Sequence, residues 1–540
     1  MKRNRIFAGL ALVFLPVMAG AFLLQARGVP EGARLFGQVF QRVQEAAVDS
    51  LAANALYEKA ARGLVKNLND PYADLYSPEE LRSFQRNNLG NNYGGVGMSI
   101  ESQDGLITVG NIFPNTPGEM SGVQVGDRIL KVDTMMVTGR PLDFVSSQLT
   151  GQPGTKVTVT LRRAGVPDPI EITVTRAIIK VPAVPFTLLL EGNVGYIPLQ
   201  RFNEVAAQHV EEAIRDLKRQ GAQGFILDLR GNPGGSLEES LKISNLFLAP
   251  GQELARVQHR GRTAEVYHAN QSSIIGGDRL VVMVNGGSAS ASEIIAGTLQ
   301  DHDRGLVVGM TTFGKGLVQT LFPLDGGWAL KLTTGKWYTP SGRSIQREHA
   351  GMDDGRFVEG GGDIVFDGAA PDTTRRGRPI FRSDAGRVVY GGGGVTPDVM
   401  VSPDTLTTIE QAFFRAISPK SQVEYATRYQ LVLDLKDEVR SPDFTFRDEW
   451  RETYWRRLQA AGVEVDRATF DGARDAVTRL IEERLSMVAF GEAVRFRRQM
   501  PIDNQLRAAL DLLQRGRTQQ ELLALADEAG LPRTGPPGGH

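Results

Sequence analysis

The chain has 540 residues, which is too long for one ordinary domain and predicts three or four units. Its 61 Lys and Arg side chains nearly balance 62 Asp and Glu, so the composition offers no basic surface of the kind that binds nucleic acid. The absence of cysteine excludes a disulfide framework, thiolate zinc sites, a cysteine nucleophile and a lipid-modified cysteine anchor.

The N-terminus carries the pattern of an export segment. Basic residues from Lys2 to Arg5 precede an uncharged apolar stretch from Ile6 to Leu24. The length of this stretch favours a retained anchor, since about 20 apolar residues span a bilayer. Pro16 and the small-residue run from Ala19 to Ala21 favour cleavage. We therefore predict export, with residues 1–28 as either a signal peptide or a signal anchor.

The first half of the chain changes from a helical to a β-rich pattern. Apolar residues at helical spacing predict two helices before residue 70, and Ser77-Pro-Glu-Glu80 marks the start of another. From Tyr93 onward, short apolar runs separated by turns predict a compact β-rich domain. Its predicted strands span residues 96–100, 106–109, 128–132, 156–162 and 170–175.

From about residue 180 to 345, predicted strands alternate with helices, which is typical of an α/β domain. Residues 351–393 are rich in Gly, Asp and Arg, and we expect a long surface excursion or flexible insert there. Beyond residue 403 the pattern is helical, and Thr518-Gln-Gln-Glu521 predicts a capping box. We expect a disordered tail at the end.

Three serines, Ser288, Ser290 and Ser292, alternate with alanines between a predicted buried strand and a predicted helix. Ser290 and Glu293 fit a capping box, which accounts for most serines at such a position. A catalytic serine also requires a base and donors for an oxyanion. No G-x-S-x-G motif surrounds these serines, and His302 would lie about 18 Å away at the far end of the helix. The six histidines are scattered, which disfavours a His triad and a local metal site.

Lys315 is the alternative base. It lies between two glycines in Phe313-Gly-Lys-Gly316, after an apolar strand over residues 306–309. Glycines permit tight packing, and desolvation favours the neutral amine that can accept a proton. Gln319 in the next strand would face the same side and could orient the amine. A solvated turn lysine remains the alternative for this segment alone.

The segment Asp228-Leu-Arg-Gly-Asn-Pro-Gly-Gly-Ser236 follows a predicted buried strand and precedes a helix. A glycine-rich turn at this position offers free backbone N–H groups, which could form an oxyanion hole. The alternatives are a plain turn and a phosphate loop, but the Gly-Lys-Ser/Thr spacing of a phosphate loop is missing.

Together these segments resemble the C-terminal processing peptidases, also called tail-specific proteases, which use a Ser–Lys dyad. The segment Ser288–Glu293 resembles their nucleophile motif, and Phe313–Gly316 resembles their lysine motif at the family's spacing. The segments Trp337–Gln346 and Gly394–Asp398 are also similar to family segments. The roles that the resemblance implies are Ser290 as nucleophile, Lys315 as general base, Gly235 and Ala291 as oxyanion donors, Gln319 as support for the lysine, and Asp301 as an acidic support.

The resemblance extends to a PDZ domain between an N-terminal helical segment and the protease core. The segment Tyr93–Ile100 resembles the carboxylate-binding loop of that domain, and Asn115–Ile129 resembles its Gly-Asp-Arg-Ile segment. A peptide would add to an edge strand there, with its terminal carboxylate held by backbone N–H groups. The loop residues that we expect to hold it are Gly94, Gly95, Val96 and Gly97.

The resemblance implies a multidomain α/β fold: a crotonase/ClpP-like protease core with an inserted β-rich PDZ domain and helical N- and C-terminal regions. The insert and the residues after 415 match nothing to which chemistry can be assigned. The expected divisions are a signal peptide or anchor (1–28), an N-terminal helical segment (33–90), the PDZ domain (91–178), the protease core (180–415), a C-terminal helical region (416–530) and a disordered tail (531–540).

The implied function is an exported serine endopeptidase that recognises protein C-termini and cleaves peptide bonds. We expect protein or peptide substrates with free C-termini, no cofactor, no metal and no nucleic acid. The N-terminal segment predicts a periplasmic or membrane-anchored location, and the resemblance implies self-association through the terminal helices. The alternative is a PDZ scaffold that captures peptides without cleaving them, and the presence of Ser290, Lys315 and the glycines favours the protease.

Overall fold

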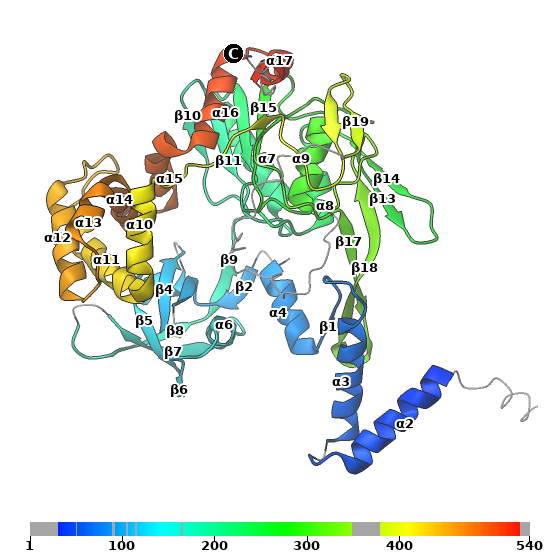
Figure 1. Ribbon diagram of the computed structural model, residues 1–540, viewed down its shortest axis with the longest axis horizontal. Coiled ribbons are helices and arrows are strands. Elements are labelled where there is room, and N and C mark those ends of the chain that lie inside the picture. The colour runs from blue at the N-terminus through cyan, green and yellow to red at the C-terminus, as the bar shows by residue number, and fades with distance from the viewer. Residues whose placement is uncertain are drawn as a thin grey trace, which may run out of the picture. The chain divides into compact units, whose positions relative to one another are not determined.

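The computed structural model describes residues 31–49, 51–88, 92–103, 106–113, 116–163, 166–347 and 378–529 (Figure 1). The expected export segment, most of the insert and the C-terminal tail lie outside these residues. Contacts divide the chain into two compact units. The first contains Met1–Pro78 and Thr320–Thr333, and the second contains Glu79–Gln319 and Thr334–His540. Within the described part of the chain, no helix has the length and apolar character needed to cross a membrane.

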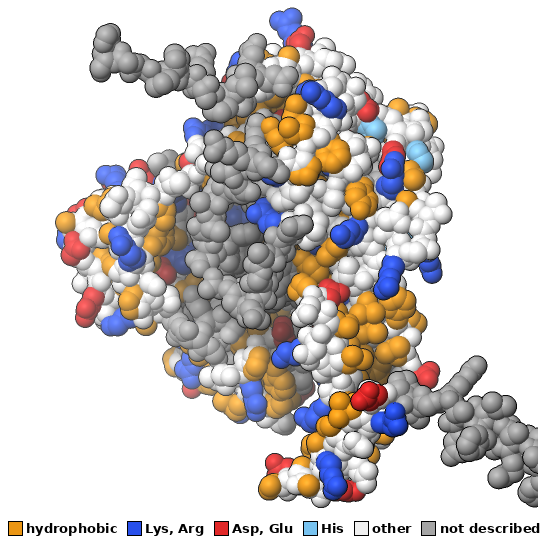
Figure 2. Space-filling model, turned by 45° about the vertical axis from the view of Figure 1, so that its right-hand side comes forward, with side chains coloured by type: hydrophobic (Ala, Val, Ile, Leu, Met, Phe, Trp, Pro, Cys, Tyr) orange, Lys and Arg blue, Asp and Glu red, His pale blue; other side chains and the backbone are white. Residues whose placement is uncertain are grey.

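The first unit combines helices with strands. Helices α2 (Glu31–Ala46) and α3 (Ala53–Lys66) precede β1 (Asp74–Tyr76), which pairs antiparallel with the first part of β18 (Ala329–Tyr338). Within the N-terminal helical segment expected over 33–90, α4 (Pro78–Asn88) begins at the helix start predicted there, and the boundary between the two units also falls at Pro78. Hydrophobic and charged side chains both reach the surface of the protein (Figure 2). The exposed hydrophobic side chains include four of α2, namely Leu35, Phe36, Val39 and Val43.

The predicted β-rich domain forms one six-stranded antiparallel sheet with its own apolar core. The path through the sheet is β3-β4-β5-β7-β8, and β6 pairs with β5, so β3 is an edge strand. Helix α6 (Leu142–Leu149) packs on the sheet, and a short pair, β2 and β9, precedes and follows it. The bounds are β2 Asn92–Gly95, β3 Met98–Gln103, β4 Leu106–Ile112, α5 Pro117–Met120, β5 Arg128–Val132, β6 Met135–Met136, β7 Lys156–Arg162, β8 Ile170–Thr175 and β9 Ala177–Lys180.

The α/β domain is built on a second six-stranded sheet, in the order β10-β11-β12-β15-β16-β21. All neighbouring pairs are parallel except β10 and β11. Its central strands are buried on both faces, which explains their continuous apolar sequence. The bounds are β10 Leu188–Leu190, β11 Val194–Pro198, β12 Gly224–Asp228, β15 Arg279–Val284, β16 Leu306–Gly309 and β21 Val399–Met400.

Helices from distant parts of the sequence cover the two faces of this sheet (Figure 1). Side chains of α7 (Ala206–Arg219), α8 (Leu237–Asn245) and α9 (Ala291–Asp301) form the core on one face. The other face is covered by α16 (Asn504–Arg515) and α17 (Gln519–Ala529), with Leu506, Leu513 and Leu522 fully buried. The C-terminal helices thus complete the core of the α/β domain.

The expected helical region over 416–530 is therefore two structures. Helices α10 to α14 surround a separate core that contains Phe413, Tyr454 and Phe470, whereas the last two helices belong to the sheet. Of the capping box predicted for α17, one bond is present, since the Thr518 hydroxyl accepts from the Glu521 N–H at 3.1 Å, whereas the Glu521 carboxylate accepts from the Arg517 N–H at 2.8 Å. The remaining bounds are α10 Thr408–Ile417, α11 Ser421–Leu435, α12 Asp448–Ala460, α13 Arg467–Gly472, α14 Arg474–Phe490 and α15 Glu492–Gln499, with 3₁₀ turns at Ser418–Lys420 and Met500–Ile502.

The last part of the segment 351–393, which was expected to be a long surface excursion or flexible insert, forms a hairpin from β19 (Ile380–Arg382) and β20 (Val388–Tyr390). Arg378 holds this part by donating to the carbonyl oxygens of Gly391 and Gly394. The protein also contains β13 (Glu253–His259), β14 (Glu265–His268) and β17 (Leu317–Pro323), and a 3₁₀ turn at Asp325–Gly327. Strand β13 pairs with β14 and with the last part of β18.

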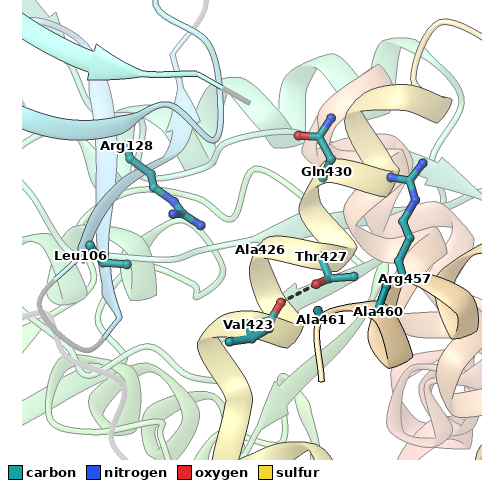
Figure 3. Close-up of a pocket in the computed structure, with 9 residues that line it drawn as sticks. All are labelled: Leu106, Arg128, Val423, Ala426, Thr427, Gln430, Arg457, Ala460 and Ala461. Atoms are coloured by element: carbon teal, nitrogen blue, oxygen red, sulfur yellow. Dashed lines mark hydrogen bonds between the residues drawn. The ribbon is translucent and has the colours of Figure 1, made fainter. Parts of the chain in front are cut away.

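Within the second unit, the β-rich domain contacts the helices of the α10–α14 bundle. The Glu101 carboxylate of β3 accepts a hydrogen bond from the Tyr425 hydroxyl at 3.2 Å and lies 4.0 Å from the Arg484 guanidinium. A pocket of about 700 Å³ opens between β4 and β5 on one side and α11 and α12 on the other (Figure 3). It is lined by Leu106, Arg128, Val423, Ala426, Thr427, Gln430, Arg457, Ala460 and Ala461.

Candidate active site

Three chain segments meet at the carboxyl ends of the parallel strands β12, β15 and β16. They are the glycine-rich turn after Asp228, the serine-rich corner after Val284 and the loop that carries Lys315. Ligands of open α/β sheets bind at this edge, because the loops that follow the strands converge there. The candidate residues that were predicted from the sequence therefore lie in loops that the sheet brings together.

Ser290 has an unusual backbone conformation, with φ of 52° and ψ of −108°. A residue with a side chain adopts positive φ at a cost of about 1–3 kcal/mol, and such residues cluster at functional sites. Ser290 is the N-cap of α9, and its carbonyl oxygen accepts from the Ile294 N–H at 2.9 Å. The corner between β15 and α9 is thus held in a strained turn with Ser290 at its tip.

The three serines have different surroundings. The Ser288 hydroxyl is fully buried and donates to the Leu229 carbonyl oxygen at 2.8 Å, and the buried Ser292 hydroxyl donates to the Asn232 carbonyl oxygen at 2.8 Å. Both therefore tie the serine corner to the glycine-rich turn. Ser290 is half-buried, and its hydroxyl donates to no other group in the described part of the chain. Only Ser290 thus keeps its hydroxyl proton available.

One buried carboxylate joins the serine corner to the lysine loop. Glu293 Oε2 accepts from the N–H groups of Ser290 at 2.8 Å and Lys315 at 2.9 Å. Its Oε1 accepts from the Thr312 hydroxyl at 2.5 Å and the Gly314 N–H at 2.7 Å. Burial raises the pKa of this carboxyl, while the four hydrogen bonds lower it. Glu293 is the capping residue that the sequence predicted, and its link to the lysine loop is additional.

Lys315 lies in a tightly held loop, and its side chain is only 7 % exposed. The indole N–H of Trp337 donates to the Lys315 carbonyl oxygen at 3.2 Å, and the Gly316 N–H donates to the Gln346 side chain at 2.8 Å. Gly314 has a φ of 96°, and a Cβ there would lie 2.8 Å from the Cβ of Arg347. The glycines on both sides therefore allow the close packing that buries the lysine. Gln319 lies in the strand that follows.

The glycine-rich turn lies against the serine corner. The Asn232 carbonyl oxygen accepts from the Ala289 N–H at 3.0 Å, and its side chain accepts from the Gly234 N–H at 3.0 Å. Gly234 has a φ of 99°, and a Cβ there would lie 2.9 Å from the Ala291 nitrogen. Among the described residues, the N–H groups of Gly235 and Ala291 donate to no other group. The two backbone donors are therefore available close to the tip of the corner.

Asp301 is not brought to this edge of the sheet. It is the last residue of α9, whose first residue follows Ser290, so it lies about 16 Å along the helix from Ser290. Its buried carboxylate pairs with the fully buried Arg343 guanidinium at 2.7 Å and accepts from the Ser341 N–H at 3.0 Å. These contacts give Asp301 a structural role in holding the segment around Arg343.

The expected carboxylate loop of the β-rich domain is shorter than the four residues assigned to it. Gly94 and Gly95 belong to β2, where they pair with Ile178 and Ala177 of β9, so only Val96 and Gly97 form the loop before the edge strand β3. In the described chain their N–H groups donate to no other group, whereas the Gly97 carbonyl oxygen accepts from Phe113 N–H at 2.9 Å. Two backbone N–H groups without acceptors among the described residues therefore lie directly before β3, which is an edge strand of its sheet.

Sequence reasoning missed the long-range contacts of three side chains that shape the site. Asn232 and Glu293 connect the loops, as described above, and the Asn285 side chain accepts from the N–H groups of Gly231 at 2.9 Å and Gly287 at 3.0 Å. An asparagine or glutamate beside a glycine-rich turn was the available signal, because such side chains commonly accept from turn N–H groups. Their partners come from other loops, which a local pattern does not reveal.

Comparison with known proteins identifies the same segments. Residues 193–354 match peptidase family S41, and residues 94–174 match the PDZ domain family. A carboxy-terminal-processing protease of Bartonella bacilliformis is 36% identical over 315 residues, which cover 58% of this chain and 72% of that protein. The carboxy-terminal processing protease CtpA of Bacillus subtilis is 36% identical over 293 residues, covering 54% of this chain and 62% of that protein.

Among solved structures, the photosystem II D1 C-terminal processing protease is 28% identical, with a TM-score of 0.37. The match covers 71% of this chain and 95% of that chain. The family matches fall on the α/β domain with its strained serine corner and on the β-rich domain with its free strand edge. The chain therefore belongs to the carboxy-terminal-processing proteases of peptidase family S41, and it is a serine-type peptidase with a PDZ domain.

Proposed function

We propose that the protein is an exported serine endopeptidase that recognises protein C-termini through its PDZ domain and cleaves peptide bonds with a Ser290–Lys315 dyad. The observation that carries the dyad is the Glu293 carboxylate, which accepts from the backbone N–H groups of both residues. A shared acceptor fixes the two loops to each other, as a nucleophile and its base require.

In this proposal the neutral Lys315 amine accepts the Ser290 hydroxyl proton while the serine oxygen attacks the substrate carbonyl carbon. The N–H groups of Gly235 and Ala291 donate to the resulting oxyanion, and the position of Ala291 at the N-terminus of α9 favours this negative charge. The Lys315 ammonium then gives its proton to the leaving amine. Water hydrolyses the acyl-enzyme by the reverse transfers. Gln319 orients the amine.

Substrate recognition is assigned to the edge of β3. The N–H groups of Val96 and Gly97 would hold the terminal carboxylate, and the peptide would extend the sheet alongside β3. Export is assigned to the basic and apolar N-terminal segment, which directs the chain to the periplasm or anchors it in the membrane. The exposed apolar face of α2 supports self-association in addition.

Cleavage of an unfolded protein substrate tests the nucleophile. Ser290→Ala should abolish cleavage and keep the fold, because it removes only a hydroxyl. Ser288→Ala and Ser292→Ala serve as matched controls, since each loses one hydrogen bond to the glycine-rich turn, worth about 1 kcal/mol, and should remain active. Cleavage by Ser290→Ala at the wild-type rate would refute the assignment.

Two otherwise identical peptides, one with a free C-terminus and one amidated, test recognition. Hydrogen bonds to a charged group contribute about 1.5–3 kcal/mol each, so the amidated peptide should show at least a roughly tenfold lower kcat/KM. Equal kcat/KM values for the two peptides would show that the protease does not recognise a free C-terminus. Fractionation of the producing cell tests export, and the mass of the recovered chain then separates a cleaved signal peptide, which shortens the chain, from a retained anchor.

A further inference from the structure

The glycine-rich turn is also held by residues outside the serine corner. Arg230 lies in this turn, and its guanidinium contacts the Asp228 carboxylate at the end of β12 with a shortest distance of 2.7 Å. The same guanidinium contacts the Asp503 carboxylate at 2.8 Å and the Gln505 side chain at 3.2 Å. Two carboxylates thus bind one largely buried arginine, and one of them comes from the C-terminal end of the chain.

Asp503 has a second contact that fixes its position. It is the N-cap of α16, and its Oδ1 accepts from the Leu506 N–H at 3.0 Å. Helix α16 is itself immobilised on the sheet by Leu506, Leu512 and Leu513, and Gln505 donates to the Val401 carbonyl oxygen at 2.8 Å. The carboxylate that faces Arg230 therefore belongs to a rigid element.

A short chain of contacts leads from Arg230 to the reacting atoms. Asn232, two positions further along the turn, accepts from the Ala289 N–H and from the Ser292 hydroxyl, on both sides of Ser290. The turn then continues through Gly234 to Gly235, whose N–H is the proposed oxyanion donor. A shift of Arg230 would therefore move the oxyanion donor relative to the nucleophile.

We propose that Asp503 is a positioning residue for the peptidase reaction, because it holds Arg230 and thereby the oxyanion turn from the N-terminus of α16. The proposal rests on the function proposed above. It gives the last helices of the chain a part in catalysis, although they lie far from Ser290 in the sequence. A displacement of about 1 Å at a reacting centre can reduce the rate on the order of a hundredfold.

The substitution Asp503→Asn tests this role, since asparagine caps a helix as well as aspartate does and only the charge that faces Arg230 is lost. We expect kcat to fall by roughly tenfold to a hundredfold, with KM changed less than about threefold. Asp503→Glu keeps the carboxylate and should recover most of the lost kcat. The matched control is Asp466→Asn, because Asp466 caps α13 in the same way, away from Arg230.

The thermal midpoint of each variant separates positioning from stability, and we expect Asp503→Asn and Asp466→Asn to change it similarly. An unchanged kcat in Asp503→Asn would overturn the proposal, and so would an equal loss of kcat in Asp466→Asn. Failure of the proposed function would be distinct from both results. It would appear as undiminished cleavage by Ser290→Ala, whatever the Asp503 variants do.

Discussion

At the scale of single residues, the site depends on side chains that hold strained backbone. The conformation of Ser290 is unfavourable for any residue with a Cβ, and it persists because the groups around it fix its N–H and its carbonyl oxygen. The same carboxylate that accepts from the Ser290 N–H also holds the lysine loop. The strained conformation of Ser290 and the placement of the lysine loop therefore depend on one buried group.

The role of Lys315 can be tested by replacing it with arginine. Lys315→Arg keeps the positive charge, but a guanidinium does not release its proton in a protein, so it cannot act as the base. We expect kcat to fall by roughly 10²- to 10⁴-fold, which is the usual contribution of a general base.

The control is His302→Gln. Both ring nitrogens of His302 have partners, Asp384 Oδ2 and the Glu253 carbonyl oxygen, each at 2.7 Å, so the imidazole is committed to structure. This variant should retain a near-native kcat. An active Lys315→Arg enzyme, or an inactive but folded His302→Gln enzyme, would contradict the dyad.

The variant Glu293→Gln should separate activity from stability. An amide cannot accept from four donors at once, so the serine corner and the lysine loop should shift and kcat should fall at least roughly tenfold. Burial raises the pKa of the Glu293 carboxyl in the folded protein above its ordinary value. The stability that this group contributes is therefore fully present below the unfolded pKa and is lost as the pH rises through the folded pKa.

Because glutamine does not titrate, Glu293→Gln does not lose this contribution, so its unfolding free energy minus that of the wild type should become more positive as the pH rises above about 4.5. The variant should thus gain stability relative to the wild type with rising pH. Denaturant unfolding of both proteins at several pH values between 4 and 8 measures this difference. A difference that is constant with pH, or one that changes in the opposite direction, would refute the role of burial.

Ser290 and Lys315 could be proposed as site residues from the sequence because each lies in a short motif of serines or glycines. Glu293 was recognised only as a helix-capping residue. A capping box accounts fully for a glutamate at that position, and its other partners, Thr312 and Gly314, lie in a loop that only the parallel sheet brings close. Long-range partners of a residue that already has a local explanation are not visible in a sequence.

At the scale of elements, the strands of both sheets were predictable where their apolar pattern was strong. The predicted strands over 128–132, 156–162 and 306–309 match β5, β7 and β16. Helices α16 and α17 were predicted as helices, but not as part of the sheet domain. An amphipathic pattern shows that a helix has a buried face and gives no information about which surface covers it.

The loop before β3 provides a test at this scale. Gly97 has a φ of 81°, and a Cβ there would lie 2.2 Å from the Cβ of Thr116, so Gly97→Ala must displace the loop. We expect KM for a substrate with a free C-terminus to rise roughly tenfold or more, with kcat little changed, because the carboxylate is held far from the reacting bond.

Gly139→Ala is the matched control, since Gly139 also has positive φ, 77°, in the same domain but has open space around it. Its KM should remain near the wild-type value. If both substitutions raise KM equally, the effect is general strain in the domain, and the carboxylate assignment to the Val96–Gly97 loop fails.

At the scale of the whole molecule, segments far apart in the sequence build one site. The glycine-rich turn, the serine corner, the lysine loop and the N-terminus of α16 all meet at one sheet in the second unit. The PDZ domain of the same unit is tied to the α10–α14 bundle through Glu101 and its partners Tyr425 and Arg484. These contacts involve the strand to which a peptide would be added.

A substitution at Gly126 tests whether the PDZ domain helps to hold α11 in place. It lies in the PDZ domain before β5 with a φ of 89°, and a Cβ there would lie 1.6 Å from the ring of Tyr429 on α11. Gly126→Ala must therefore displace the tyrosine and loosen α11 from the PDZ domain. Gly122→Ala is the control, because Gly122 has a similar φ, 81°, with nothing near its absent side chain. Amide hydrogen exchange over Ser421–Leu435 should become faster in Gly126→Ala and stay unchanged in Gly122→Ala. Equal protection of α11 in both variants would show that the helix is held by its own bundle alone.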